Sequence, residues 1–301
     1  MRFANVHVRI ARINAHNYPH KRTRQGHVDC TAVIVAKVFD RDHLWVTMRV
    51  HSSLDPLLIA EKGYVAVDGT FDDCQDLVKA MFADVAFRDE VRLSAVNSIN
   101  WARIAAQSVY YAATQATLGH DRPLRFVVPS GNMGDMLAGY VAARCGLLAG
   151  FEGVCAVNEN GALRILFEEG RMLRSSAAAT PSPAMDISVP SNFERLAYEV
   201  SGRDPELIRS IYGAFAQSGD VDLPERIRGP LGCSGISATA VSNAATLHEM
   251  QTFLAETGWL ICPHTAVGTQ AARNLALGAS ATVVLATAHA AKFPETVKEA
   301  T

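Results

Sequence analysis

The sequence predicts an α/β protein in which a parallel sheet is flanked by helices. From Asp68 onward, short apolar runs alternate with longer segments of helical periodicity. This alternation is typical of strands that are connected by crossover helices. Hydrophobic residues make up 49% of the 301 residues, which is enough to form a substantial core. We therefore expect a globular chain with one large domain or two ordinary ones.

The first expected elements of this pattern are a strand at 64–67 and a helix at 70–83. Thr70 can cap the helix, and acidic residues in its first turn favour the positive end of the helix dipole. A brief strand at 93–96 follows, and a polar turn leads from it into a helix at 101–114.

A second strand–helix pair surrounds a loop that contains two glycines. Residues 124–128 form an apolar run that predicts a strand, and a helix is expected at 136–145, closed by Gly146. Further along, Ser191 and Glu194 have the spacing of a capping box, which predicts a helix that begins there. The run 282–286 predicts a last buried strand.

Composition excludes several classes of protein. Charged residues amount to 19% and the formal net charge is −2, so nothing global indicates a nucleic-acid or membrane partner. Six cysteines are scattered without a CxxC pair or a zinc-ligand spacing, so we expect reduced thiols, no metal site and a cytoplasmic protein. There is no run of about 18 apolar residues of the kind that spans a membrane.

The first 28 residues carry six basic residues and no acid. Such a bias is found in transit peptides and in nucleic-acid-binding arms. However, Val6, Val8 and Ile10 alternate with polar residues as in a strand, whereas a transit peptide forms an amphipathic helix. Targeting and nucleic-acid binding stay open as minor alternatives.

The loop Ser130 to Asp135 lies between the strand at 124–128 and the following helix. Its glycines allow the backbone to turn sharply and to approach an anion, and the N–H groups at a helix N-terminus favour a phosphate there. Asn132 adds a side-chain donor. The alternative is steric, because a strand-to-helix turn often needs glycine without any ligand.

The segment VPSGNMGDMLAGYVA at Val128 to Ala142 resembles the corresponding loop of threonine synthases, which usually reads Gly-Asn-Phe-Gly-Asn or Gly-Asn-Phe-Gly-Asp. Further segments match that family in the same order: GTFDDCQDLVKAMFAD at 69–84, LSAVNSINWARI at 93–104, SPAMDISVPSNFERL at 182–196, CPHTAVG at 262–268 and LATAHAAKFP at 285–294. The resemblance extends from Tyr64 to Thr301.

This resemblance implies a pyridoxal-phosphate-dependent enzyme of fold type II, the tryptophan synthase beta-like fold, with an incomplete small domain. The expected divisions are an unmatched basic segment at 1–63, a remnant of the small domain at 64–120 and a large cofactor-binding domain at 121–301. The implied cofactor phosphate site consists of Gly131, Asn132, Met133, Gly134 and Asp135. In the same family pattern, Thr287 is expected to hydrogen-bond the pyridine nitrogen.

The family's activity is the conversion of O-phospho-L-homoserine and water to L-threonine and phosphate, in threonine biosynthesis. The implied substrate-binding residues are Asn97, Ser98, Asn100 and Arg103. An equally weighted alternative is that the first two satisfy a turn and that Asn100 caps the following helix. His264 and His289 could be catalytic, although a structural hydrogen bond is the more common role of a histidine at such positions.

One family feature is not found in this sequence. The lysine that forms the Schiff base stands in a Pro-Thr-Leu-Ala-Phe-Lys-Asp segment, and Lys21, Lys37 and Lys62 lack those neighbours. The catalytic residue is therefore unknown, and activity of this chain is in doubt. We expect either a displaced or truncated reading frame or a non-catalytic relic that binds pyridoxal phosphate or phosphate. The sequence does not indicate an oligomeric state.

Overall fold

The computed structural model describes residues 3–11, 33–40, 43–51, 78–91, 93, 98–119, 122–275 and 281–301. The expected strand at 64–67, the start of the helix at 70–83 and most of the strand at 93–96 lie outside these residues. The chain divides into two compact units, Met1–Val96 and Asn97–Thr301. The domain boundaries expected from the sequence stay predictions.

The unit Met1–Val96 contains a three-stranded antiparallel sheet. Its strands are β1 (Phe3–Ala11), β2 (Val33–Asp40) and β3 (His43–His51), and β3 lies between the other two. The strand expected from the alternation at Val6, Val8 and Ile10 is thus confirmed as part of β1. A short helix, α3 (Val85–Val91), follows in the same unit.

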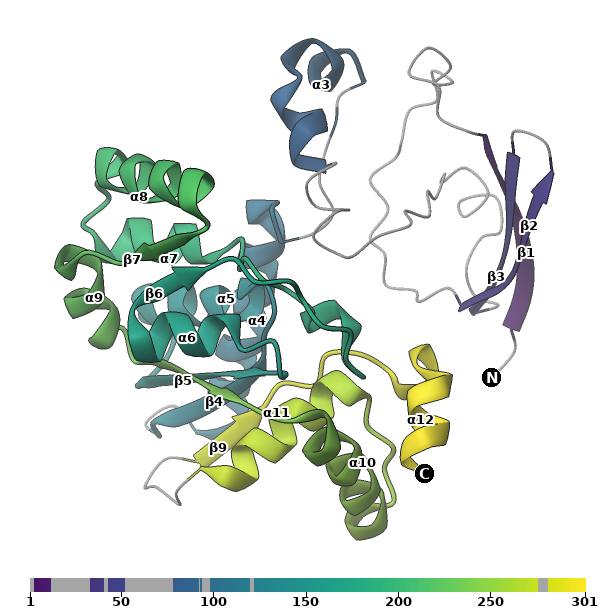
Figure 1. Cartoon of the computed structure of the whole chain (residues 1–301). Helices are drawn as coiled ribbons and strands as arrows, with labels where there is room; N and C mark the ends of the chain where they lie inside the picture. Colours follow the sequence, from purple (N-terminus) through teal and green to yellow (C-terminus); the bar gives the residue numbers. More distant parts are fainter. Residues whose placement is uncertain are drawn as a thin grey trace. The chain divides into compact units, whose positions relative to one another are not determined.

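The unit Asn97–Thr301 is built on a parallel sheet of four strands (Figure 1). They are β4 (Leu124–Pro129), β5 (Phe151–Val157), β8 (Ile236–Ala240) and β9 (Ala281–Val284). All three pairings are parallel, as the alternation of strands and helices predicts. The expected strands at 124–128 and 282–286 correspond to β4 and β9, although β9 was expected to be buried and its residues are half-buried or exposed.

The order of these strands is β8-β5-β4-β9. The chain moves outward from β4 through β5 to β8, and then returns to place β9 on the other side of β4. The order therefore reverses between β4 and β9. In open parallel sheets, ligands bind outside the carboxyl ends of the strands at such a switch point.

Three helices of this unit correspond to those expected at 101–114, at 136–145 and from Ser191, with bounds that differ by up to four residues. Helices cover both faces of this sheet. They are α4 (Trp101–Leu118), α5 (Gly134–Arg144), α6 (Ala162–Glu169), α7 (Phe193–Val200), α8 (Pro205–Ser218), α9 (Glu225–Gly232), α10 (Asn243–Thr257), α11 (Pro263–Asn274) and α12 (Pro294–Ala300). The single turns η1 (Pro183–Met185) and η2 (Ala290–Lys292) and the small sheet of β6 (Arg171–Leu173) with β7 (Asp220–Asp222) complete the unit.

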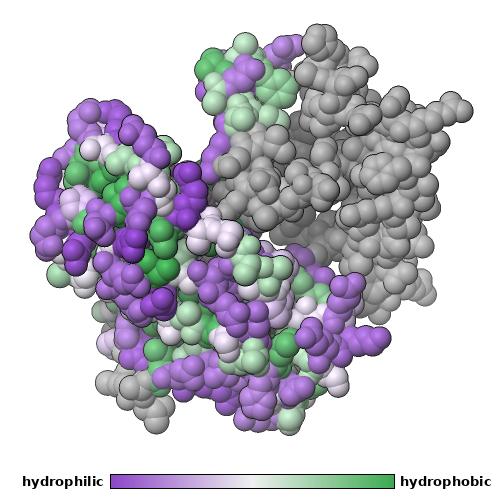
Figure 2. All heavy atoms as spheres, viewed as in Figure 1, coloured by the Kyte–Doolittle hydropathy of each residue, from purple (hydrophilic) through white to green (hydrophobic). Residues whose placement is uncertain are grey.

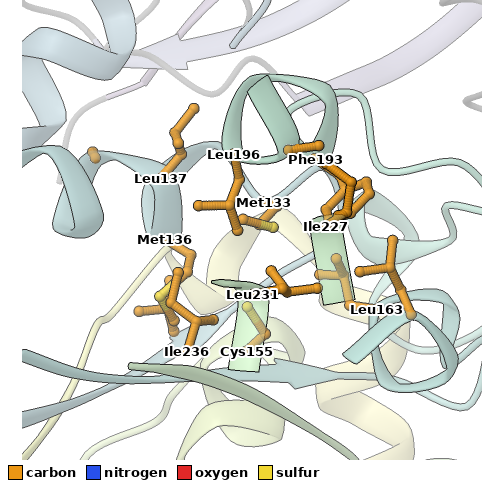
Figure 3. Packing of buried hydrophobic residues seen from close by; sticks show 14 of the residues in the cluster. Met133, Met136, Leu137, Cys155, Leu163, Phe193, Leu196, Ile227, Leu231 and Ile236 are labelled. Atoms are coloured by element: carbon orange, nitrogen blue, oxygen red, sulfur yellow. The ribbon is translucent and has the colours of Figure 1, made fainter. Parts of the chain in front are cut away.

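The core follows from the alternation of side chains along the strands. Phe126 and Val128 of β4 join a large cluster that includes residues of α4 to α9, whereas Val127 between them joins a cluster with Val267 and Ala271 of α11. Part of the large cluster is seen in Figure 3. Burial on both faces explains why β4 is apolar along most of its length.

The surface of the unit Asn97–Thr301 is mixed. On the face seen in Figure 2, hydrophilic residues cover most of it, with small hydrophobic areas between them. Among the helices of the described residues, none has the length and apolar character needed to cross a membrane.

One local prediction is wrong. The helix expected at Ser191 is α7, but its N-cap is Asn192, whose side chain makes no capping hydrogen bond. Ser191, the first residue of the predicted capping box, is instead hydrogen-bonded to Asn132 of the loop that forms the site.

Candidate functional site

The loop Ser130–Asp135 lies at the carboxyl end of β4, at the switch point of the sheet. Ser130 N donates to Ala156 O at 2.8 Å, which holds the start of the loop against β5. Met133 has a left-handed backbone (φ 61°, ψ 16°) and is the N-cap of α5, without a side-chain capping bond. The hydrogen bond from Leu137 N to Met133 O, at 3.0 Å, belongs to the first turn of α5. The N–H groups that precede it have no partner within the helix, and N–H groups at a helix N-terminus favour an anion.

Both glycines of this loop are in close contact with neighbouring segments. A Cβ on Gly131 would lie 2.9 Å from Ile187 Cγ1 and 3.0 Å from Ala184 O. A Cβ on Gly134 would lie 2.7 Å from Ser98 Cβ. Glycine is therefore required sterically at both positions. The close approach at Gly134 places the segment before α4 directly against the loop.

Met133 anchors the loop in the core. Its side chain is 1% exposed and lies beside Leu196 and Phe193 in the cluster of Figure 3. Because this side chain points inward, the surface that the loop offers to a ligand is mainly backbone. The methionine at a position where the resembling loops carry phenylalanine thus fills an apolar site.

Asn132 links the loop to the start of α7. Its Oδ1 accepts hydrogen bonds from Ser191 N at 3.2 Å and Ser191 Oγ at 3.0 Å. Its main-chain oxygen accepts from Asn192 N at 3.2 Å and Asn192 Nδ2 at 3.0 Å. The loop conformation is therefore fixed by side chains about 60 residues later in the chain.

The segment before α4 joins the same network. Ser98 Oγ accepts from Asn192 Nδ2 at 3.0 Å, and Ser98 O accepts from Arg195 Nη1 at 2.8 Å. Asn100 Oδ1 accepts from Ala102 N at 3.0 Å, so it caps α4 as the structural alternative proposed. Asn97 lies outside the described residues. Asn192 and Arg195 were missed by the sequence reasoning, because the spacing of Ser191 and Glu194 indicated only the start of a helix in this segment.

Asp135, in the first turn of α5, is a buried carboxyl group. Its buried Oδ1 has no hydrogen-bond partner among the residues that the structure describes, and burial raises the pKa of the carboxyl group from the ordinary 3.8 to about 6. The positive charge of Arg103 acts in the opposite direction. Tyr111 Oη donates to the main-chain oxygen of Asp135 at 2.8 Å, so α4 and α5 meet at this residue.

Thr287 follows β9, the neighbour of β4. Leu285 N donates to Val127 O at 3.0 Å, so the chain still runs beside β4 two residues before Thr287. The Thr287 side chain is exposed, and its N–H donates to Thr265 Oγ1 at 3.2 Å. Neighbouring parallel strands thus bring Thr287 and the loop to the same edge of the sheet.

The two histidines considered from the sequence make structural hydrogen bonds. His264 Nε2 accepts from Ala184 N at 3.1 Å, and His289 Nδ1 accepts from Ala291 N at 3.1 Å. Burial, with a smaller effect of Lys292, lowers the pKa of His264 from 6.5 to about 4. His264 is therefore a neutral hydrogen-bond acceptor at physiological pH.

A hollow of about 470 Å³ lies elsewhere in this unit. It is lined by Phe151 and Gly235 among others, which stand where β5 and β8 begin. It is therefore at the opposite edge of the sheet from the loop, and it is not part of the candidate site.

Comparison with known proteins agrees with this architecture. The family model "Threonine synthase, C-terminal" matches residues 265–301. The chain is 41% identical over 239 residues to a threonine synthase of Pseudomonas aeruginosa and 39% identical over 247 residues to that of Corynebacterium glutamicum. Each match covers 78% of this chain and 50% of the relative, so the chain spans about half the length of the curated relatives it matches.

Solved structures give the same result. The chain is similar to a pyridoxal-phosphate-bound threonine synthase from Brucella melitensis, with 45% identity and a TM-score of 0.70, over 78% of this chain and 50% of that one. The yeast threonine synthase gives 37% identity and a TM-score of 0.67 with the same coverage. Both the sequence and the α/β fold of the matched part therefore place this chain in the threonine synthase family.

Proposed function

We propose that this chain carries the pyridoxal phosphate site of a threonine synthase at the switch point of its parallel sheet. One observation carries the proposal. The N-terminus of α5 begins at a glycine and has no side-chain cap, and it follows β4, which pairs with the strand that leads to Thr287. The free N–H groups at a helix end of this kind favour binding of an anion. The relative from Brucella melitensis is a pyridoxal-phosphate-bound protein, which supports the choice of this anion.

The residues present fit this cofactor. The backbone N–H groups of Gly131 to Asp135 would hold the phosphate, and the Thr287 hydroxyl would hydrogen-bond the ring nitrogen. Pyridoxal phosphate, when bound, withdraws electrons from the carbon that bears a substrate amino group, which facilitates loss of the substrate phosphate and addition of water. A neutral hydroxyl at the ring nitrogen would moderate that withdrawal compared with an aspartate.

The substrate that this family suggests is O-phospho-L-homoserine, which would be converted with water to L-threonine and phosphate. Ser98 lies against Gly134, and the charge of Arg103 acts on Asp135, so both residues lie beside the loop. A guanidinium here would complement the substrate phosphate. Asn97 and Asn100 complete the proposed substrate segment, although Asn100 Oδ1 already caps α4.

A second candidate is a relic that binds pyridoxal phosphate or phosphate without turnover. It is favoured by the sequence, whose 301 residues contain no Pro-Thr-Leu-Ala-Phe-Lys-Asp segment. A lysine in that context holds the cofactor and moves protons, so its loss would affect the chemistry far more than phosphate binding. We accordingly expect little or no release of phosphate from O-phospho-L-homoserine by this chain alone.

Titration of the chain with pyridoxal phosphate, and separately with pyridoxal, tests the shared part of both candidates. We expect saturable binding of pyridoxal phosphate and much weaker binding of pyridoxal, because the loop binds the phosphate. Equal affinity for the two compounds, or no binding, would contradict the proposal.

Borohydride reduction then separates the two candidates. It fixes the cofactor covalently to any lysine amine that has condensed with it, and peptide mass spectrometry identifies that lysine. A labelled lysine together with phosphate release supports the enzyme. Reversible binding without labelling supports the relic.

A further inference from the structure

The first turn of α11 contacts both parts of the proposed cofactor site. His264 Nε2 accepts a hydrogen bond from Ala184 N in η1 at 3.1 Å. The next residue, Thr265, accepts through Oγ1 a hydrogen bond from Thr287 N at 3.2 Å. Two adjacent residues of one helix therefore reach toward the phosphate side and the ring side of the site.

The turn η1 stands directly between His264 and the loop. Ala184 O and Met185 Cα would each lie 3.0 Å from a Cβ on Gly131, so the backbone of η1 forms the wall against which Gly131 packs. A shift of this wall by a few tenths of an ångström would change the space available to Gly131.

The same turn is held at its far end by a carboxylate. Asp186 Oδ1 accepts from Asn158 Nδ2 at 2.8 Å and from Thr180 Oγ1 at 2.6 Å. Asn158 directly follows β5, so this end of the turn is tied to the sheet. His264 supplies the corresponding attachment to α11.

The imidazole of His264 is suited to a fixed acceptor role. It is 4% exposed, and its ring lies 4.8 Å from the Phe293 ring, between centroids. Because Nε2 accepts a hydrogen bond, Nδ1 carries the proton in the neutral ring. Nδ1 is buried without a hydrogen-bond partner in the described part of the chain, so the ring is held mainly by packing and by Ala184.

We infer that His264 is a positioning residue for the phosphate loop, which acts by fixing η1 against Gly131. This inference rests on the proposed function, since it assigns the loop to the cofactor phosphate. Loss of the acceptor removes the hydrogen bond that ties Ala184 N to α11, which favours displacement of the wall.

The test compares His264→Phe, which removes the acceptor, with His264→Gln, whose side-chain oxygen replaces it. Gln270→Ala, on a later turn of α11, is the control variant. Hydrogen exchange of peptides that cover 183–187 and 130–135 is measured in the ligand-free chain. The dissociation constants for pyridoxal phosphate and pyridoxal are measured on the same proteins.

In His264→Phe we expect exchange of both segments to be up to about tenfold faster and pyridoxal phosphate binding up to about tenfold weaker, as the loss of one hydrogen bond predicts. Binding of pyridoxal should not change, and His264→Gln should restore most of both effects. If His264→Phe does not fold, His264→Met replaces it, because methionine also lacks a strong acceptor and adapts to irregular space.

Unchanged exchange in the acceptor-free variant, or failure of glutamine to restore it, would overturn the inference. A wild-type chain that binds no pyridoxal phosphate would instead contradict the proposed function. The exchange comparison decides the role of His264 in either case, because it needs no ligand.

Discussion

Gly131 is closely confined, because three groups of the segment 184–187 lie within 3.0 Å of a Cβ at that position. We predict that Gly131→Ala displaces the loop from η1 and weakens pyridoxal phosphate binding about tenfold, as expected for an overpacked site. A fluorescence or absorbance titration measures this.

Gly213 provides the matched control for that substitution. It lies within α8, and a Cβ there would meet nothing within 4 Å. Gly213→Ala should therefore stabilise the chain slightly, by about 0.5–1 kcal/mol, through helix propensity, with unchanged ligand binding. Equal effects of the two alanines on binding would show that the contact of Gly131 with η1 is irrelevant to the site.

Asp135 gives a prediction about stability and pH. Its folded pKa of about 6 lies above the ordinary 3.8, so between these values the folded chain binds more protons than the unfolded chain. The contribution of this carboxyl group to the free energy of unfolding is fully present below about pH 4 and is lost as the pH rises through 6. The charged carboxylate therefore costs up to about 3 kcal/mol at pH 7 to 8.

Asp135→Asn should consequently raise the free energy of unfolding at neutral pH, by about 1–3 kcal/mol, and change it little at pH 4. Urea unfolding at several pH values measures the difference. A gain that is the same at pH 4 and pH 7.5 would show that ionisation of Asp135 is not its cause.

At the scale of elements, α7 is joined to the start of α4 by Arg195. Its guanidinium donates to Ser98 O at 2.8 Å and Ile99 O at 2.5 Å, and it lies 5.9 Å from the Trp101 ring centroid. These contacts use the planar fork of arginine, which lysine does not reproduce. They fix the segment that carries Ser98 beside the loop.

We predict that Arg195→Lys leaves α7 folded but loosens the segment 98–101. Hydrogen exchange of peptides from this segment should become faster, with little change in peptides from α8. Arg209→Lys, on the exposed surface of α8, is the control and should change neither. Unaltered exchange at 98–101 would mean that another contact holds the segment.

Periodicity in the sequence was sufficient to predict β4, β9, α4 and α5, because each carries apolar residues that pack against the core. It could not predict the partners of Ser98, since Asn192 is 94 residues away in the chain. The capping-box spacing even indicated a different use for this part of the chain. Local patterns identified the loop, whereas the network that fixes it depends on tertiary contacts.

At the scale of the whole molecule, the order of the strands in the parallel sheet determines where the candidate site lies. Thr287 is 152 residues after Asp135 in the printed sequence, yet β9 pairs directly with β4. The sequence predicts a parallel sheet but not its order, because many orders satisfy the same alternation. Thr287 was identified as a candidate through the resemblance to threonine synthases. The register of β4 with β9 shows how a parallel sheet can bring this residue near the loop.

The described residues of the candidate site all belong to the unit Asn97–Thr301. We predict that a fragment of these residues binds pyridoxal phosphate with the affinity of the full chain. Circular dichroism reports whether the fragment folds, and the same titration reports binding. A folded fragment without binding would show that the unit Met1–Val96 contributes to the site.

A crystal structure of the chain soaked with pyridoxal phosphate tests the central claim most directly. We predict electron density for the phosphate within hydrogen-bond distance of the backbone nitrogens of Gly131 to Asp135, with the ring nitrogen toward Thr287 Oγ1. Density for the cofactor at another edge of the sheet, or an N-terminus of α5 closed by protein side chains instead, would contradict it.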